Sequence, residues 1–487
     1  MESRDIVNLG VLGRFYSCRN VLGFYRCTSA LAVCTYSTAG LPHPDTSFME
    51  RFDRALYQTV QYHPSLCYGI VDKTPDREAH FLRLKVVYKE DVAEFCGQTP
   101  EEARQNDDDT STIKLLEKSH ARILSEGHCK PAWRVVVFKH GGQWGSESQQ
   151  LGQSVQKLSI AFLASHAIAD GLSHTNFHKT FFHFFNSSQP EELVWPYQVP
   201  RDLRCPILLE EVVDLQARDE NDNTHINYDS TNIWSGANMF LSSIEEYESG
   251  LRLVNLPLAQ LGKVLQFCKS CKITLTGLIH GLLVTYLSRA IAPGHMFRAV
   301  IPYSMRHITK VADDEICNHA SALVVDSPDE LASAIRTTPT NSSQELELII
   351  GIATDYRRHM AAELARSPKN NVWAGMFGID DWYGPSLSQL GKKRALTYEL
   401  SNFGNVEVVE SDKLQGAPLS LEKVVVSQCG SVTGPVFCCN CISIPGGPMT
   451  ITLTWQKGSV EEDIINNFAE YLTERLRAGF DSVSQKE

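Results

Sequence analysis

His166 and Asp170 are the residues whose types and spacing are best suited to chemistry in this 487-residue chain. An imidazole with an unperturbed pKa of about 6.5 can accept a proton from a substrate hydroxyl near neutral pH. Gly171 follows the aspartate and is expected to turn with a positive φ, which would bring the main chain close to a substrate. The motif therefore suggests a general base presented at a turn.

The same residues have a structural interpretation, in which His166 is a core histidine and Asp170 caps the start of a helix. The spacing alone does not separate the two, because His225 and Asp229 repeat it in a polar stretch with no strand pattern before it. That second pair is expected to lie in a solvated linker. For His166, both interpretations stay open on the residues alone.

Two flanking segments must position the histidine. Residues 158–165 form a short apolar run bounded by polar sequence, which predicts a buried strand. Beyond the motif, the spacing of Leu172, Phe177 and Phe181 is typical of a helix covered on one face. His166 is therefore expected where a strand ends and a helix begins, a place where a side chain can face a cleft.

Other reactive side chains are expected to be structural. His174 and His178 have a metal-ligand spacing, but no HExxH pattern accompanies them, so a surface or cleft-edge face is favoured. The acidic run at 107–109 predicts a solvated loop. Cys268 and Cys271 predict two thiols on a helix surface, and no metal site is predicted.

Composition argues against several functions. The net charge of -12 and the sequence pI near 5.8 argue against a nucleic-acid partner. No apolar run is long enough to span a bilayer, and the acidic N-terminus is not typical of a signal peptide. The 14 cysteines are then expected to be reduced thiols in a cytoplasmic protein, either free or peripheral on an endomembrane or lipid droplet.

The chain is long enough for two domains joined by a linker. A polar stretch near its middle predicts an N-terminal domain at 1–205, a crossover linker at 206–250 and a C-terminal domain at 251–487. A polar loop is expected at 99–110. Strands are predicted at 31–36, 66–71, 81–88, 133–138, 298–303, 421–428, 436–443 and 450–456, and helices at 47–60, 91–95, 112–124, 258–268, 274–291, 346–365 and 460–476.

The sequence lacks a nucleophile-elbow G-x-S-x-G, a Walker lysine loop and a dinucleotide G-x-G-x-x-G. His166 therefore has no evident Ser or Cys nucleophile to activate. A histidine that deprotonates a substrate hydroxyl directly, beside a bound acyl donor, needs no covalent intermediate.

Further motifs extend over nearly the whole chain, at 12–13, 19–25, 166–172, 177–178, 274–280, 390–394, 401–405, Gln428 and 454–458. In their order and spacing the chain resembles the fungal alcohol O-acetyltransferases. These belong to the wider HxxxD superfamily, with the plant BAHD acyltransferases, carnitine and chloramphenicol acetyltransferases and peptide-synthetase condensation domains. The resemblance also separates His166 from the repeated spacing at His225.

The resemblance implies an α/β (α+β) fold with two chloramphenicol-acetyltransferase-like domains, each a mixed β-sheet with flanking helices, joined by the crossover segment. A tunnel between the domains would hold His166 at its middle, with coenzyme A entering from one mouth and the alcohol from the other. Asp170 would point away from the substrate and pair with an arginine, for which we nominate Arg306.

Two more segments gain expected roles from the resemblance. Asn402 and Gly404 lie where plant relatives have Asp-Phe-Gly-Trp-Gly, and without that carboxylate a structural turn holding the domains together is expected. Lys392, Lys393 and Arg394 are candidates for binding the coenzyme phosphates, with a solvated basic loop as the alternative.

The leading hypothesis is an acyl-CoA-dependent O-acyltransferase, which moves acetyl from acetyl-CoA to a small alcohol or a fungal secondary metabolite. It would hold no permanent cofactor, with acetyl-CoA or another acyl-CoA as co-substrate. The alternatives are an acyl donor tethered to a carrier protein, acylation of an amine, and a non-catalytic relative. A monomer is expected, with the helix at 460–476 packed on its own core rather than on lipid.

Overall fold

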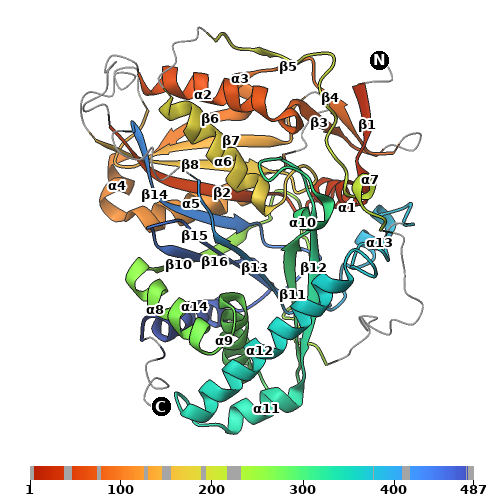
Figure 1. The fold of residues 1–487 in the computed structure, drawn as a ribbon, viewed down its shortest axis with the longest axis vertical. Helices are drawn as coiled ribbons and strands as arrows, with labels where there is room; N and C mark the ends of the chain where they lie inside the picture. Colours follow the sequence, from red (N-terminus) through yellow and green to blue (C-terminus); the bar gives the residue numbers. More distant parts are fainter. Residues whose placement is uncertain are drawn as a thin grey trace.

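Two large mixed sheets form the framework of the protein, and helices cover them (Figure 1). The computed structural model describes residues 5–37, 47–73, 78–124, 130–144, 155–187, 193–215, 232–376, 378–408, 417–478 and 480. The repeated spacing at His225 and Asp229 lies outside the described residues. The predicted α/β class with mixed sheets is confirmed.

The first sheet consists of β2 (Thr28–Tyr36), β6 (Ala93–Gly97), β7 (Trp133–Lys139), β8 (Gln156–Ala164) and β14 (Leu419–Gln428). Its order is β14-β2-β8-β7-β6, antiparallel except where β6 meets β7. The strand that leads to His166, β8, is therefore central, with a partner on each side. Hydrogen bonds from both neighbours hold the backbone that enters the motif.

Both faces of this sheet are covered, because successive residues of its strands enter different cores. On β2, Ala32 packs in the core that includes residues of α2 (Phe48–Tyr62) and α6 (Gly171–Asn186). The next residue, Val33, packs in a separate core with residues of α5 (Asp108–His120). The strands consequently read as continuous apolar runs rather than as alternating ones.

The second sheet consists of β10 (Ser249–Leu256), β11 (Phe297–Ser304), β12 (Ala320–Ser327), β13 (Tyr398–Asn405), β15 (Phe437–Ser443) and β16 (Met449–Gln456). Its order is β10-β16-β15-β13-β11-β12, and β13 runs parallel to both of its neighbours. The helices packed in its core are α8 (Leu258–Ser270), α9 (Leu275–Ala290), α12 (Ser343–Arg366) and α14 (Glu462–Ala478). The apolar stripe of α14, with Phe468 and Leu472 buried, packs on this core as predicted.

The two halves of the chain share the first sheet. β14 comes from the second half, yet it pairs with β2 along its whole length. Figure 1 shows β14, drawn in blue, beside strands from the red and orange part of the chain. The domain boundaries expected at 205 and 250 stay a prediction.

The remaining elements are short or lie around the two sheets. They are β1 (Ile6–Asn8), α1 (Gly10–Val21), η2 (Pro64–Cys67), β3 (Tyr68–Val71), β4 (His80–Arg83), β5 (Val86–Val87), α3 (Lys89–Val92), α4 (Pro100–Gln105), β9 (Tyr197–Gln198), α7 (Leu209–Val212), α10 (Arg306–Thr309), α11 (Asp329–Thr337) and α13 (Tyr383–Leu387). Among the described residues no single helix is long and apolar enough to cross a membrane, and α8 with α9 qualifies only as a pair bent by 94°.

Two predicted segments are wrong. The helix expected at 91–95 ends at Val92, and the following residues form β6, since parallel pairing with β7 satisfies their main chain. The loop expected at 99–110 contains α4 and the start of α5. There Asp107 is a helix cap, whose carboxylate accepts a hydrogen bond of 2.8 Å from the Thr110 amide.

Candidate active site

His166 lies in the tight connection between β8 and α6, as predicted. It is partly exposed, whereas its neighbours Ser165 and Ala167 are buried. The connection is held at both ends, because the Ser165 amide donates to Ala132 at 2.9 Å and the Asp170 amide donates to Cys317 at 3.0 Å. The imidazole is therefore presented from a fixed backbone.

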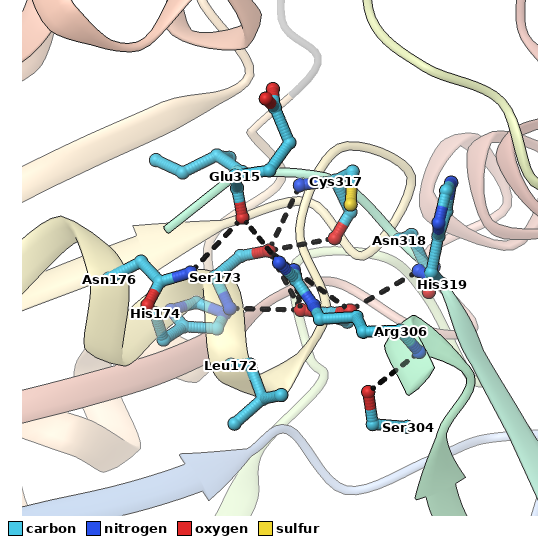
Figure 2. Close-up of polar contacts among 12 residues, drawn as sticks. Leu172, Ser173, His174, Asn176, Ser304, Arg306, Glu315, Cys317, Asn318 and His319 are labelled. Carbon is cyan, nitrogen blue, oxygen red and sulfur yellow. Dashed lines mark hydrogen bonds and ion pairs between the residues drawn. The ribbon is translucent and has the colours of Figure 1, made fainter. Parts of the chain in front are cut away.

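Asp170 combines two roles that the sequence left open. It caps α6, accepting hydrogen bonds from the Ser173 amide at 2.9 Å and the Ser173 hydroxyl at 2.7 Å. It also pairs with Arg306, whose Nη2 lies 3.0 and 3.2 Å from the two carboxylate oxygens. Figure 2 shows Arg306 extended toward Ser173, which bonds the same carboxylate. Both side chains are only 4% exposed, so this is a fully buried ion pair.

Arg306 ties the catalytic loop to the second half of the chain. Its Nη1 donates to the main-chain oxygen of Glu315 at 2.8 Å, and Nη2 also reaches the Ser173 hydroxyl at 3.1 Å. The Asp170 carboxylate in turn accepts from the His319 amide at 3.2 Å. Burial alone would raise the pKa of Asp170, but Arg306 and Ser173 more than offset it, so the net pKa lies below the ordinary value.

Asn318 is a contact of His166 that sequence reasoning missed. Its Nδ2 donates to the main-chain oxygen of His166 at 2.6 Å and lies 3.1 Å from Nδ1 of the imidazole. The flanking residues Cys317 and His319 both bond to Asp170, so this segment is fastened to the motif on either side of Asn318. No local pattern signals such a contact, because the two residues are 152 positions apart.

Aromatic side chains from the first segment of the chain cover the histidine. The Tyr16 ring stacks on the His166 ring, with centroids 4.1 Å apart and planes 21° apart, and the Tyr25 ring lies 6.0 Å away. Burial lowers the pKa of His166 to about 4, although the negative charge of Asp170 favours the protonated ring. The imidazole is therefore neutral, and able to accept a proton, at physiological pH.

His174 and His178 of α6 are not at a surface or cleft edge as expected. His174 is buried, with Nε2 2.6 Å from the Thr28 hydroxyl, and burial lowers its pKa to about 3. His178 is also buried and reaches the Ala30 carbonyl at 2.9 Å. Both rings face β2, where they anchor α6 to the sheet. Among the described residues no cluster of three or more His, Cys, Asp or Glu is arranged to hold a metal.

Gly171 is needed for close packing, and the positive φ expected there is wrong. A Cβ at this position would lie 1.9 Å from Cε1 of Phe403. Phe403 stands between Asn402 and Gly404, whose turn is closed by a 2.9 Å hydrogen bond from the Gly404 amide to Asn402, with φ of +75° at Gly404. The Asn402 side-chain amide also donates to the Thr276 hydroxyl at 3.0 Å, and both of these residues lie in the second half of the chain. Phe403 is the residue of this turn that packs against Gly171 of the first half, and a role of the turn in holding the domains together stays a prediction.

The three basic residues at 392–394 differ from one another. Arg394 is 2% exposed, and its guanidinium donates to the Ser431 carbonyl at 2.8 Å and to Gln456 at 3.1 Å. Its charge is therefore used inside the protein. Lys392 and Lys393 are exposed, and binding of coenzyme phosphates by them stays a prediction.

A small cavity lies beside the motif. Ala167, Ile168 and Asn318 line it, together with Leu12 of α1 and Leu208. The two residues that follow His166 line this cavity, whereas His166 itself does not. A tunnel with His166 at its middle stays a prediction.

Comparisons with known proteins indicate which class of protein this chain resembles. No protein-family model matches the chain. The probable alcohol acetyltransferase FCK4 of Fusarium pseudograminearum is 24% identical over 496 aligned residues, covering 96% of this chain and 94% of that protein.

Solved structures share the fold over nearly the whole chain. The TRI3 trichothecene 15-O-acetyltransferase of Fusarium sporotrichioides has a TM-score of 0.66 at 11% identity, covering 97% of this chain and 94% of that one. TRI101 of F. sporotrichioides, complexed with coenzyme A and T-2, has a TM-score of 0.58 at 12% identity, covering 96% and 98%. The condensation domain of the Monacolin K polyketide synthase MokA has a TM-score of 0.53 at 11% identity, covering 98% of each.

The fold is thus shared, over nearly the whole chain, with TRI3, TRI101 and the MokA condensation domain. The sequence is similar over nearly its whole length to a probable alcohol acetyltransferase, which confirms the resemblance predicted from the sequence.

Proposed function

We propose that the protein is an acyl-CoA-dependent O-acyltransferase, which moves an acetyl group from acetyl-CoA to the hydroxyl of a small alcohol or a fungal secondary metabolite. The observation that carries this proposal is the neutral, partly exposed imidazole of His166, held by both halves of the chain. The relatives support the choice of substrates, since FCK4 is a probable alcohol acetyltransferase and TRI101 binds coenzyme A with T-2.

In this mechanism His166 is the general base. The neutral imidazole takes the proton of the acceptor hydroxyl while the alcohol oxygen attacks the thioester carbonyl carbon. The carbon–sulfur bond then breaks, and the imidazolium returns its proton to the thiolate of the coenzyme. The products are the ester and the free thiol, and no bond to the protein forms.

Asp170 and Arg306 act through position rather than by proton transfer. The carboxylate is used by Arg306, Ser173 and His319, so it holds the loop and the start of α6. An aspartate engaged in this way keeps the base in its geometry, and a misplacement of about 1 Å can cost about 100-fold in rate. Asn318 would serve the same end from the second half, through the His166 carbonyl.

The test is release of free thiol from acetyl-CoA, measured across a panel of alcohols and polyketide-like hydroxy compounds. His166→Ala is expected to lower acceptor-dependent release about 10²–10⁴-fold while acetyl-CoA still binds. His183→Ala is the matched control, because His183 is an exposed histidine of α6, the helix that follows His166. Full activity of a folded His166→Ala variant would refute the mechanism.

The same assay separates the alternatives. A wild-type protein that binds acetyl-CoA but transfers only to amines would be an N-acyltransferase. Transfer from an acyl carrier protein, without release from or binding of acetyl-CoA, would replace the coenzyme by a tethered donor.

A further inference from the structure

Glu399 is an acidic residue near the candidate site for which the proposed mechanism has no use. It lies on β13, and its Oε1 accepts hydrogen bonds from Gln428 Nε2 at 2.7 Å and from the Ser401 hydroxyl at 3.1 Å. Both donors are neutral. Among the described residues no cation forms an ion pair with this carboxylate, and Oε2 accepts no hydrogen bond.

The strand register places Glu399 at the same end of the first sheet as the catalytic loop. Gln428, the last residue of β14, is in register with Thr28, and Thr28 is in register with Ala164 of β8. His166 follows two residues later. Two strand spacings of about 4.8 Å separate Gln428 from β8, so the partner of Glu399 and the catalytic loop are roughly 10 Å apart.

Two tyrosine side chains lie between Gln428 and the loop that carries His166. The Tyr25 hydroxyl donates to Gln428 Oε1 at 2.6 Å, and its ring lies 6.0 Å from that of His166. Tyr16, which stacks on His166, is close enough to feel the carboxylate: burial raises the pKa of Tyr16 above its ordinary value, and the charge of Glu399 raises it further. Glu399 is therefore connected to the surroundings of His166 through Gln428 and Tyr25.

The ionised form of the Glu399 carboxyl group is disfavoured in its present surroundings. Burial raises the pKa of Glu399, and only the hydrogen bonds from Gln428 and Ser401 and the charge of Arg19 oppose that. Glu399 is partly exposed, as His166 is, so its free oxygen can accept a hydrogen bond from a ligand. Coenzyme A carries phosphates, which a carboxylate repels, and the acceptor alcohol is the better partner.

We propose that Glu399 anchors the acceptor substrate, by accepting a hydrogen bond from a second hydroxyl or amine while the reacting hydroxyl lies at His166. Such an acceptor carries a second polar group in addition to the reacting hydroxyl, as a diol or an amino alcohol does. A 1,4-disubstituted cyclohexane presents two such groups at opposite ends of one ring. The inference rests on the proposed function, to which it adds a substrate class: polyfunctional alcohols.

The test compares cyclohexanol, trans-1,4-cyclohexanediol and trans-4-aminocyclohexanol as acceptors in the thiol-release assay. The wild-type protein is expected to favour the diol or the amino alcohol over cyclohexanol by at least about tenfold in kcat/KM, mainly through KM. Glu399→Ala should abolish this preference and leave cyclohexanol within about twofold. Glu347→Ala, at an exposed glutamate of α12, is the control, and Glu399→Gln tests the charge with the shape retained.

Calorimetric binding of the same three compounds separates the inference from the proposed function. Tighter binding of the amino alcohol or the diol to wild type than to Glu399→Ala would support the anchor even if no acetyl transfer occurred. A wild-type protein with no preference, or a folded Glu399→Ala variant that keeps the preference, would overturn the inference while leaving the acyltransferase intact.

Discussion

Replacing Arg306 by Met tests whether the ion pair with Asp170 holds the catalytic loop. The change removes the guanidinium but keeps an unbranched side chain of similar length. It leaves the Asp170 carboxylate, which is 4% exposed, with its hydrogen bonds from Ser173 and His319 and without a counter-charge.

The expected cost follows from the burial of the pair. Removing one partner of a buried, hydrogen-bonded ion pair costs about 3–5 kcal/mol, because the charge that remains is left uncompensated. Domains are stable by only about 5–15 kcal/mol, so this loss is a large share of the total. Adding Asp170→Asn to Arg306→Met removes the stranded charge and should recover part of the loss.

Urea unfolding followed by tryptophan fluorescence measures the effect. Arg358→Met is the control, since Arg358 pairs with Asp355 in an exposed i,i+3 pair whose side chains are 70% and 64% exposed, and its loss should cost less than about 1 kcal/mol. An Arg306→Met variant within about 1 kcal/mol of both wild type and this control would refute the reasoning. So would a double variant less stable than the sum of its single changes.

Two further outcomes follow from the site. Gly171→Ala should destabilise the protein by about 1–3 kcal/mol and lower activity, because the new Cβ would meet Phe403 at 1.9 Å, whereas Gly262→Ala, with open space around it, should be neutral in thermal unfolding. A Gly171→Ala variant that unfolds with wild type would contradict the packing. Because burial lowers the pKa of His166 to about 4, kcat/KM should stay flat from about pH 8 down to about pH 6, and an acid limb centred near 6.5 would count against this. The same lowered pKa values make the stability depend on pH. Between about pH 6.5 and 4 the unfolded chain binds protons that native His166, His174 and His178 do not. The free energy of unfolding should therefore fall as the pH falls through that range.

The connection around His166 is readable from local sequence for a physical reason. An apolar run bounded by polar residues, followed by a period-3.6 pattern, encodes strand then helix, as β8 and α6 confirm. The Asp170 cap is likewise local, since its carboxylate bonds Ser173 three residues on. By contrast, residues 93–95 are expected to belong to a helix at 91–95, and only parallel pairing with β7 makes them part of a strand.

The residues that complete the site are brought to His166 and Asp170 only by the tertiary structure. Arg306 is 136 residues from Asp170, and its nomination came from a family resemblance rather than from spacing. Asn318, Tyr16 and Glu399 carry no local signal that they meet around the motif.

The sequence by itself determined the strand and helix on either side of His166 and the resemblance to the alcohol acetyltransferases, because those depend on short-range periodicity and on the order of motifs. Tertiary structure alone decided what surrounds them: the burial of His174, the reason for a glycine at 171, and the neutral state of His166. Packing, desolvation and hydrogen bonding depend on which distant segments of the chain cover a residue. The local sequence around that residue does not show which segments these are.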